Sequence, residues 1–300
     1  MTFRRSVLPG ILLLASSLVP AEALACATCG CGDPTLTTMG SEQPFAGRFR
    51  MGVQATAGTL VIGTKGVDLE QVAEARFDLS AAYAPLPWLF FSASMPLLAR
   101  QVTDVNLARE LGVGPGDLDL RARAYVFKDR DFGAHHLLAV SLGVALPTGP
   151  ALHDEAAVPL SLDAQVGTGA VTPIAGLAYS GFFGDVSAYA SVTGALPGRG
   201  YQGFRRGLQV RSTLAGQFQL NTRWALRMAV DTQWEAPGED ADGTPDLVGA
   251  GLMAYASPDV IFSPTQDVVL QLGIRWHFLA LTPQPFHPGP LLAFAVAYDR

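Results

Sequence analysis

The sequence predicts an all-β protein, a transmembrane antiparallel β-barrel of about 12 strands. Three observations favour this fold class. Long segments alternate apolar and polar residues, long and short connections alternate between these segments, and the composition is 49% hydrophobic with only 15% charged residues. Despite that composition, no internal run reaches the roughly 18 apolar residues that a membrane-spanning helix needs. A soluble periplasmic β-sandwich is the alternative fold.

The clearest pair of strands lies within residues 207–234. Apolar and polar residues alternate along 208–220, and the alternation resumes after a turn that begins at Asn221. Successive side chains of a strand point to opposite faces, so each segment has one apolar and one polar face. The length of each segment is closer to that of a bilayer-crossing strand, about 9–11 residues, than to that of a strand in a globular protein, about 5–6 residues. Trp224 and Trp234 lie near opposite ends of one apolar face, where barrels carry aromatic girdles.

Three strands are predicted before this pair in the first third of the chain, at 48–57, 73–83 and 88–99. In the first two, apolar residues alternate with arginines, carboxylates and amides. The third contains Pro96, which fits a bulge or a sheet edge better than a flat ladder because proline lacks the backbone N–H. A long loop is predicted at 101–115.

Four more strands are predicted at 117–126, 136–146, 170–179 and 185–196. The first of these alternates aliphatic residues with charged residues and a tyrosine. The second is apolar on both faces, with small residues on one of them. The last two flank a tight turn at 181–184, which is rich in glycine.

The last three strands are predicted at 247–262, 268–278 and 291–298. In the second of them, aliphatic and aromatic residues alternate with a polar set that includes Arg275 and His277. Together with the pair at 208–220 and 223–234, this completes an even number of strands, as in bacterial single-chain barrels.

The connections give an independent indication of the fold. They alternate between long and short along the chain; the longest is 148–168, and the turn at 264–267 is the least regular. Outer-membrane barrels have short periplasmic turns and longer outside loops. A soluble sandwich has no reason to sort its loops in this way, so the pattern favours the barrel.

The start of the chain has the features of an export signal. Basic residues precede an apolar core, and an A-x-A cleavage site lies at 23–25. We therefore predict a signal peptide at 1–25, a Cys-rich periplasmic lead-in or plug segment at 26–46, and a barrel at 47–300. The expected location is the outer membrane of a Gram-negative bacterium.

The chain has three cysteines, Cys26, Cys29 and Cys31, all within six residues. In an oxidising periplasm they could form a local disulfide with one thiol left over, or a Cys29–Cys31 pair beside a lipidated Cys26. Clustered thiolates also suit a soft metal such as copper, although no fourth ligand is nearby. We expect no cofactor, with a soft metal at these cysteines as the alternative.

Two short glycine-based motifs carry a family resemblance. Residues 114–127 open a strand with G-x-G-D, and 142–149 end a strand with P-T-G. With them, most of the chain after about residue 45 resembles the outer-membrane family of MetA-pathway phenol-degradation proteins. The resemblance implies a channel or transporter for small, often aromatic compounds. The Cys-rich start departs from the family, and so does the end of the chain at Arg300 rather than at an aromatic residue.

The polar faces of the predicted strands are rich in arginine. Guanidinium groups in a lumen select anions or aromatic faces, but they can also pair structurally with neighbouring carboxylates, which is the interpretation we favour for most of them. Twelve strands leave a narrow lumen, because barrel diameter grows with strand number. The predicted lumen-lining residues are Arg50, Arg76, Asp78, Arg121, Arg123, Arg211, Arg227, Asp231, Arg275 and His277.

The sequence does not favour catalysis or nucleic-acid binding. It has no G-x-S-x-G motif, and its histidines are scattered without a carboxylate at a diagnostic spacing. The net charge of −6 argues against nucleic acid as a partner.

We therefore predict a passive channel or transporter for small molecules, such as aromatic or hydrophobic compounds. Its expected partners are outer-membrane lipids, the barrel-assembly machinery and the solute. The alternative is a barrel without transport that serves as a structural component or handles metal with a periplasmic partner through residues 26–46.

Overall fold

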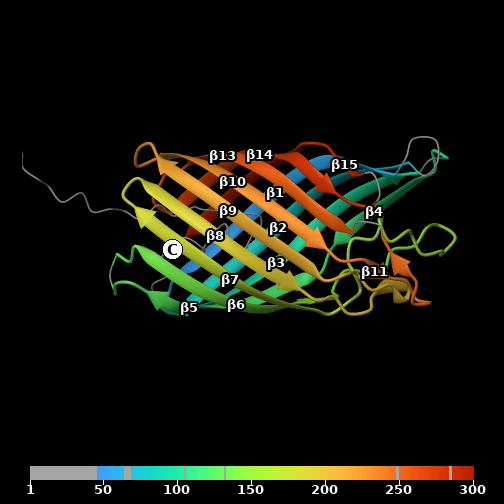
Figure 1. The fold of residues 1–300 in the computed structure, drawn as a ribbon, viewed down its shortest axis with the longest axis horizontal. Coiled ribbons are helices and arrows are strands. Elements are labelled where there is room, and N and C mark those ends of the chain that lie inside the picture. The colour runs from blue at the N-terminus through green and yellow to red at the C-terminus, as the bar shows by residue number, and fades with distance from the viewer. Residues whose placement is uncertain (1–45, 64–68, 105, 132, 248–249, 284–285) are drawn as a thin grey trace, which may run out of the picture.

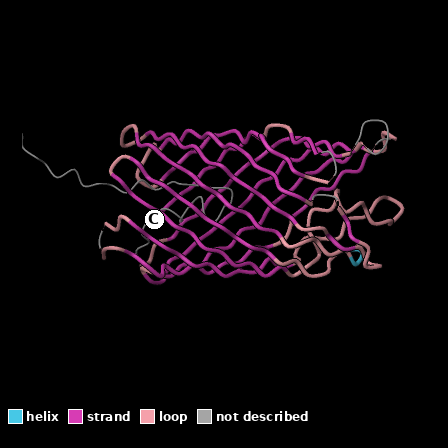
Figure 2. Tube along the Cα trace, viewed as in Figure 1, coloured by secondary structure: helices cyan, strands magenta, loops and turns pink. Residues whose placement is uncertain are grey.

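The computed structural model describes residues 46–300 except 64–68, 105, 132, 248–249 and 284–285. These residues form an antiparallel barrel with loops gathered at one end (Figures 1 and 2). The predicted signal peptide and the three cysteines lie outside the described residues. Within the described residues, no helix is long and apolar enough to cross a membrane.

The strands follow one another along the chain with one short 3-10 turn, η1 (Tyr201–Gly203), before β9. Their bounds are β1 (Phe49–Ile62), β2 (Glu70–Leu86), β3 (Leu89–Thr103), β4 (Arg109–Pro115), β5 (Leu118–Lys128), β6 (His136–Leu146), β7 (Thr172–Phe183), β8 (Val186–Ala195), β9 (Gln209–Gln219), β10 (Trp224–Glu235), β11 (Gly238–Glu239), β12 (Pro245–Asp246), β13 (Gly251–Phe262), β14 (Val268–Leu281), β15 (Phe286–Pro288) and β16 (Leu291–Asp299).

Each strand of the barrel pairs with its neighbours in chain order, and β16 returns to pair with β1. β4 and β5 both lie beside β3, and β15 and β16 both lie beside β1, so the wall has twelve strand positions. β11 and β12 form a separate two-stranded sheet in one of the loops. The predicted fold class, a transmembrane antiparallel barrel of about 12 strands, is confirmed.

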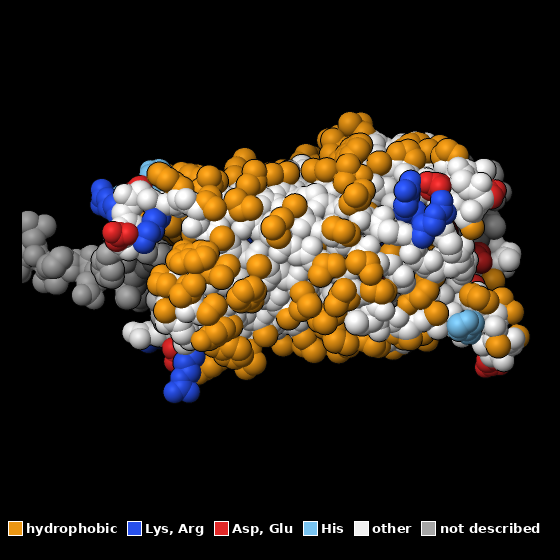
Figure 3. Space-filling model, turned by 90° about the horizontal axis from the view of Figure 1, so that it is seen from below, with side chains coloured by type: hydrophobic (Ala, Val, Ile, Leu, Met, Phe, Trp, Pro, Cys, Tyr) orange, Lys and Arg blue, Asp and Glu red, His pale blue; other side chains and the backbone are white. Residues whose placement is uncertain are grey.

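The outer surface of the barrel is apolar and the inner surface is polar or small. On β10, Trp224, Leu226 and Met228 are exposed, whereas Ala225 and Arg227 between them are buried. The same alternation covers the visible face with hydrophobic side chains between charged ends (Figure 3). Closure leaves no unpaired sheet edge in the apolar zone, as a barrel in lipid requires.

The predicted loop at 101–115 is wrong. β3 continues to Thr103, the chain turns, and β4 (Arg109–Pro115) pairs back along β3. Alternation in β4 is hard to see in the sequence because its inward positions include Gly112, whose Cβ would lie 1.9 Å from the Ala164 carbonyl oxygen. Close approach of another backbone explains this glycine.

Pro96 lies where the pairing of β3 passes from β4 to β5. Leu97 is opposite Pro115, whereas Ser94 is opposite Asp119. The partner chain from β4 to β5 therefore has one more residue than β3 over this interval. The Gly116 N–H donates to the Pro96 carbonyl at 2.8 Å. The bulge predicted at this proline is therefore present.

Candidate functional site

The inner surface carries two groups of charged residues on opposite sides of the barrel. Strands β6 to β8 separate them in one direction, and β16 and β1 separate them in the other. The first charged wall, on β2, β3 and β5, consists of Glu74, Arg76, Asp78, Arg100, Asp119, Arg121 and Arg123. The second charged wall, on β9, β10, β13 and β14, consists of Arg211, Arg227, Asp231, Tyr255, Asp259, Arg275 and His277.

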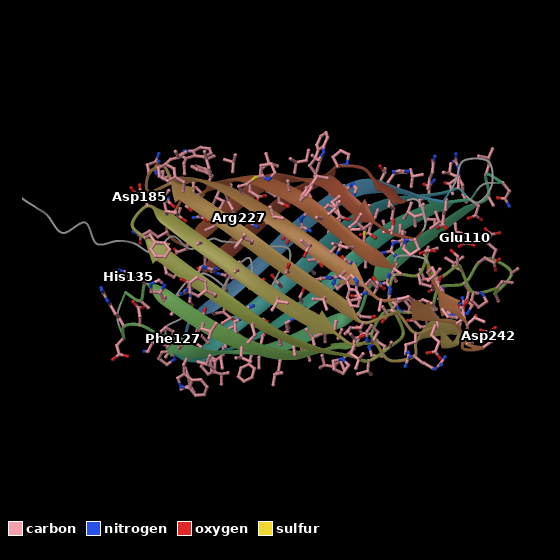
Figure 4. The ribbon with its side chains drawn as sticks, in the orientation of Figure 1. Glu110, Phe127, His135, Asp185, Arg227 and Asp242 are labelled. Carbon is pink, nitrogen blue, oxygen red and sulfur yellow. The ribbon has the colours of Figure 1, made fainter. Side chains whose placement is uncertain are left out.

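All predicted lumen-lining residues except Arg50 belong to these two walls. The structure places them on the inner face of their strands; whether they contact a solute stays a prediction. Figure 4 shows Arg227 in the barrel wall, between His135 and Asp185 at the end where the short turns lie and Glu110 and Asp242 at the end with the long connections. We call these the short-turn end and the long-loop end.

On the first charged wall, two arginines pair with carboxylates of their own strand. Arg76 donates to Asp78 from Nε at 2.8 Å and from a terminal nitrogen at 2.7 Å. Arg121 donates to Asp119 at 2.8 and 2.6 Å. Residues two apart on a strand share a face, which brings each pair together. These two arginines are therefore paired structurally with carboxylates, as expected from the sequence for most of the lumen arginines.

Arg123 differs from its neighbours because it has an aromatic partner. Its guanidinium carbon lies 5.3 Å from the ring centroid of Phe90, within the range of a cation–π interaction. The residue is only 4% exposed, and its Nη1 has no hydrogen-bond partner within the described part of the chain. Its charge is therefore covered by the ring.

On the second charged wall, the carboxylates are engaged by other side chains. Arg227 donates to Asp259 at 2.7 Å, and both side chains are buried. Asp231 accepts hydrogen bonds from the hydroxyl groups of Thr213 at 2.7 Å and Ser257 at 2.8 Å. Buried carboxylates require such partners, and these lie on adjacent strands.

Tyr255 lies at the centre of the remaining residues of this wall. It is opposite His277 in register, and their rings meet edge to face with centroids 5.7 Å apart. Arg275 lies two residues before His277 on the same face, and Arg211 lies on β9, two strands away. Arg275 forms no ion pair with any described residue.

Arg50 lies at the short-turn end, where the first and last strands meet. It pairs with Asp299 of β16, which also accepts from the Nε of Arg48 at 2.9 Å. All three side chains are largely buried. We call this pairing of β1 with β16 the barrel seam.

Sequence reasoning missed the residues that hold a loop over the barrel mouth. Residues 147–171, the mouth loop, fold inward at the long-loop end, where Leu160 and Ala164 pack against the inward-facing Val72 and Val102. This contact makes the inner wall apolar there. A loop rich in small residues gives no periodic signal that would predict such a contact.

Gln165 is the centre of the mouth loop. Its amide oxygen accepts from the Leu152 N–H at 2.8 Å, and its amide nitrogen donates to the carbonyls of Leu152 at 3.0 Å and Leu160 at 3.1 Å. The residue is only 3% exposed. Such full satisfaction of a buried amide fixes the loop in one conformation.

Two charged residues attach the mouth loop to the wall. Arg100 donates to the carbonyls of Asp163 at 3.1 Å and Gln165 at 3.0 Å, while its Nε donates to Glu74 at 2.8 Å. Glu110 of β4 accepts from the backbone and hydroxyl of a serine in the loop at 2.9 and 2.6 Å. Arg100 lies one residue beyond the predicted end of its strand, so it was not included in the predicted site.

A second loop covers the mouth loop. Tyr201 of η1 donates from its hydroxyl to the carbonyl of Gly149, and its ring lies against Gly169, which has a φ of +68°. Gln202 donates to the Leu160 carbonyl at 3.1 Å. The loops at this end therefore interlock rather than extend separately into solvent.

The long-loop mouth is also acidic. Burial and the nearby carboxylates of Asp163 and Asp104 raise the pKa of Glu70 to about 7. Glu70 lies beyond the apolar part of the outer surface. The exposed polar residues Gln71 and Gln101 mark the limit of that part on the outer faces of β2 and β3. Among the described residues, no group of three or more His, Cys, Asp or Glu is placed to hold a metal ion.

No protein-family model and no curated protein sequence matches the chain. Among solved structures, it is similar to an outer membrane channel from Pseudomonas putida F1, with a TM-score of 0.68 at 14% identity over 87% of this chain and 97% of that one. It is also similar to the transport unit of the autotransporter AIDA-I from Escherichia coli, with a TM-score of 0.50 at 7% identity over 86% of this chain and 91% of that one. These likenesses show the fold, and the resemblance to the MetA-pathway family stays a prediction.

Proposed function

We propose that the chain is an outer-membrane channel through which small molecules pass passively along the lumen. The observation that carries the proposal is the pair of charged walls that face each other inside a barrel with an apolar outer surface. Charge on the inside of a closed barrel has no role in contact with lipid but can select solutes. The similar Pseudomonas putida F1 structure is that of an outer membrane channel, which supports the same role.

The long-loop end would face the outside and the short-turn end the periplasm, as in other outer-membrane barrels. A solute would then meet the mouth loop first and the two charged walls next. The solute class is small molecules, with aromatic compounds favoured by the family resemblance. Nothing in this route requires a covalent step, so we propose no enzymatic activity.

A barrel without transport is the second candidate, and the interlocked loops over the mouth favour it. The contacts of Gln165, Tyr201 and Gln202 hold the covering loops closed in this structure. In that case the protein would act as a structural component or with a periplasmic partner through residues 26–46, of which 26–45 lie outside the described residues.

Planar-bilayer recording of refolded residues 26–300 distinguishes these functions. We expect stable single-channel conductance steps, and a reversal potential under a salt gradient that reports the sign of the lumen field. Folding is checked by heat-modifiable gel mobility. Persistent silence of folded protein would contradict the channel and favour the second candidate. Deleting residues 26–46 is the matched control, because conduction through the barrel should survive it.

A further inference from the structure

We infer that Arg211, Tyr255 and Arg275, with His277 behind the tyrosine ring, form a subsite for the carboxylate group of a small organic acid. The inference rests on the proposed channel function and names the chemistry of its solute. It assigns solute binding to the second charged wall rather than to the arginines of the lumen in general.

Strand pairing brings these side chains together from three strands. Tyr255 on β13 is directly opposite His277 on β14, and Arg275 lies two residues before His277 on the same face. Arg211 comes from β9, which β10 separates from β13; it is opposite Gln233, two residues along β10 from Asp231, which is opposite Tyr255. Arg211 and Arg275 thus lie on the same inner face, on either side of Tyr255.

The carboxylates of this wall are already engaged. Asp231 is held by two hydroxyl groups at 2.7 and 2.8 Å. Asp259 is held by Arg227 at 2.7 Å, and both side chains are buried. Arg275 is near Asp259 but forms no ion pair with a described residue, so its hydrogen-bond donors remain available to a solute.

These side chains are also accessible from the lumen. Arg211 is exposed, and Tyr255 and Arg275 are partly exposed. On the first charged wall, Arg121 is paired within its own strand and Arg123 is covered by Phe90. The second charged wall therefore presents to the lumen Arg275, which forms no ion pair with a described residue, beside the phenol of Tyr255.

A carboxylate suits this arrangement. The planar fork of arginine donates two parallel hydrogen bonds to a carboxylate, and the phenol hydroxyl can donate a third. A neutral alcohol of the same shape offers neither the charge nor the second oxygen. The subsite should therefore distinguish benzoate from benzyl alcohol, two probes that share a ring.

The test is block of chloride current through single channels by benzoate, with benzyl alcohol as the neutral comparison. We expect benzoate to interrupt the current at concentrations where benzyl alcohol does not. Arg275→Gln should weaken the block about tenfold, as expected for a lost hydrogen bond to a charged group. Tyr255→Phe should weaken it less, because it removes one donor and keeps the ring.

Arg130→Gln is the matched control, since it removes the same charge from an exposed residue in the turn between β5 and β6. It should leave the benzoate block unchanged. Equal block by both probes, or unchanged block in folded Arg275→Gln protein, would overturn the subsite while chloride conduction still supported the channel. Calorimetric titration of detergent-folded protein with benzoate tests the subsite independently: binding that Arg275→Gln weakens is expected even without current, and absence of binding overturns the inference.

Discussion

At the scale of single residues, the partners of each arginine decide what its charge can do. Arg76 and Arg121 have carboxylates on their own strands, Arg123 has an aromatic ring, and Arg227 has a buried aspartate. Charges so paired contribute little field to the lumen. In the proposed channel, selectivity would therefore depend on Arg275, which forms no ion pair with a described residue.

Glu70 makes the stability of the mouth depend on pH. Its pKa in the folded protein is about 7, against an ordinary value of 4.5, so the folded state binds its proton more tightly than the unfolded state does. This contribution is complete below pH 4.5 and is lost as the pH rises through about 7.

We expect thermal unfolding in detergent to occur at a higher temperature at pH 5 than at pH 8. Glu70→Gln should reduce this difference, because glutamine cannot titrate. Asp242→Asn is the control: Asp242 lies at the same end, and its pKa is lowered rather than raised, by hydrogen bonds from Thr244. An unchanged pH dependence in Glu70→Gln would contradict the prediction.

At the scale of elements, the β3–β4 hairpin and the mouth loop form one packed unit. β4 lengthens the wall beyond β5 and supplies Glu110 to the loop, while β3 supplies Arg100. Gly112 allows the loop backbone to approach the wall. Loop and hairpin should therefore loosen together.

Gly112→Ala tests this coupling. The added Cβ would lie 1.9 Å from the carbonyl oxygen of Ala164, a backbone atom that can move only with the loop. We expect faster proteolysis and amide hydrogen exchange in residues 150–168, at a cost of about 1–3 kcal/mol. Gly216→Ala is the matched control, because nothing lies within 4 Å of its added Cβ. Equal protection in both variants would show that the loop is not held by this contact.

The sequence predicts the elements of the wall better than the contacts between them. Alternation locates β9 and β10 almost to the residue, since both faces there are long and distinct. It fails at β4, where glycines occupy inward positions. Parity places Arg50 on the inner face but cannot name Asp299 as its partner, 249 residues away. The inward fold of the mouth loop depends on Gln165, which reads in the sequence as an ordinary solvated loop residue.

At the scale of the whole molecule, the barrel seam joins the two ends of the described chain. Backbone hydrogen bonds of 2.8 Å run in both directions between Phe49 and Arg300, and Asp299 binds Arg48 and Arg50 beside them. The seam closes the sheet, so its stability belongs to the barrel rather than to one strand pair.

Asp299→Asn should destabilise the barrel by about 3–5 kcal/mol, because it leaves two buried guanidinium groups without a counter-charge. Urea-induced unfolding in lipid vesicles measures the change. Asp131→Asn is the comparison, since the Asp131 side chain pairs with Lys128 while 97% exposed, and solvent screens such a pair. Its loss should cost much less than the loss of Asp299. Similar losses in the two variants would show that the seam ion pairs are no stronger than surface pairs.

The seam also has a consequence in time. Apart from the pairings of β1 with β15 and β16, neighbouring strands are close in the chain, but Arg48 and Asp299 are 251 residues apart. Contacts between distant residues form slowly, since the ordering entropy is lost before they repay it. Until they form, β1 and β16 are open edges that another copy of the chain can extend. Misassembly of this protein should therefore begin at its first and last strands, within the interval before the seam closes.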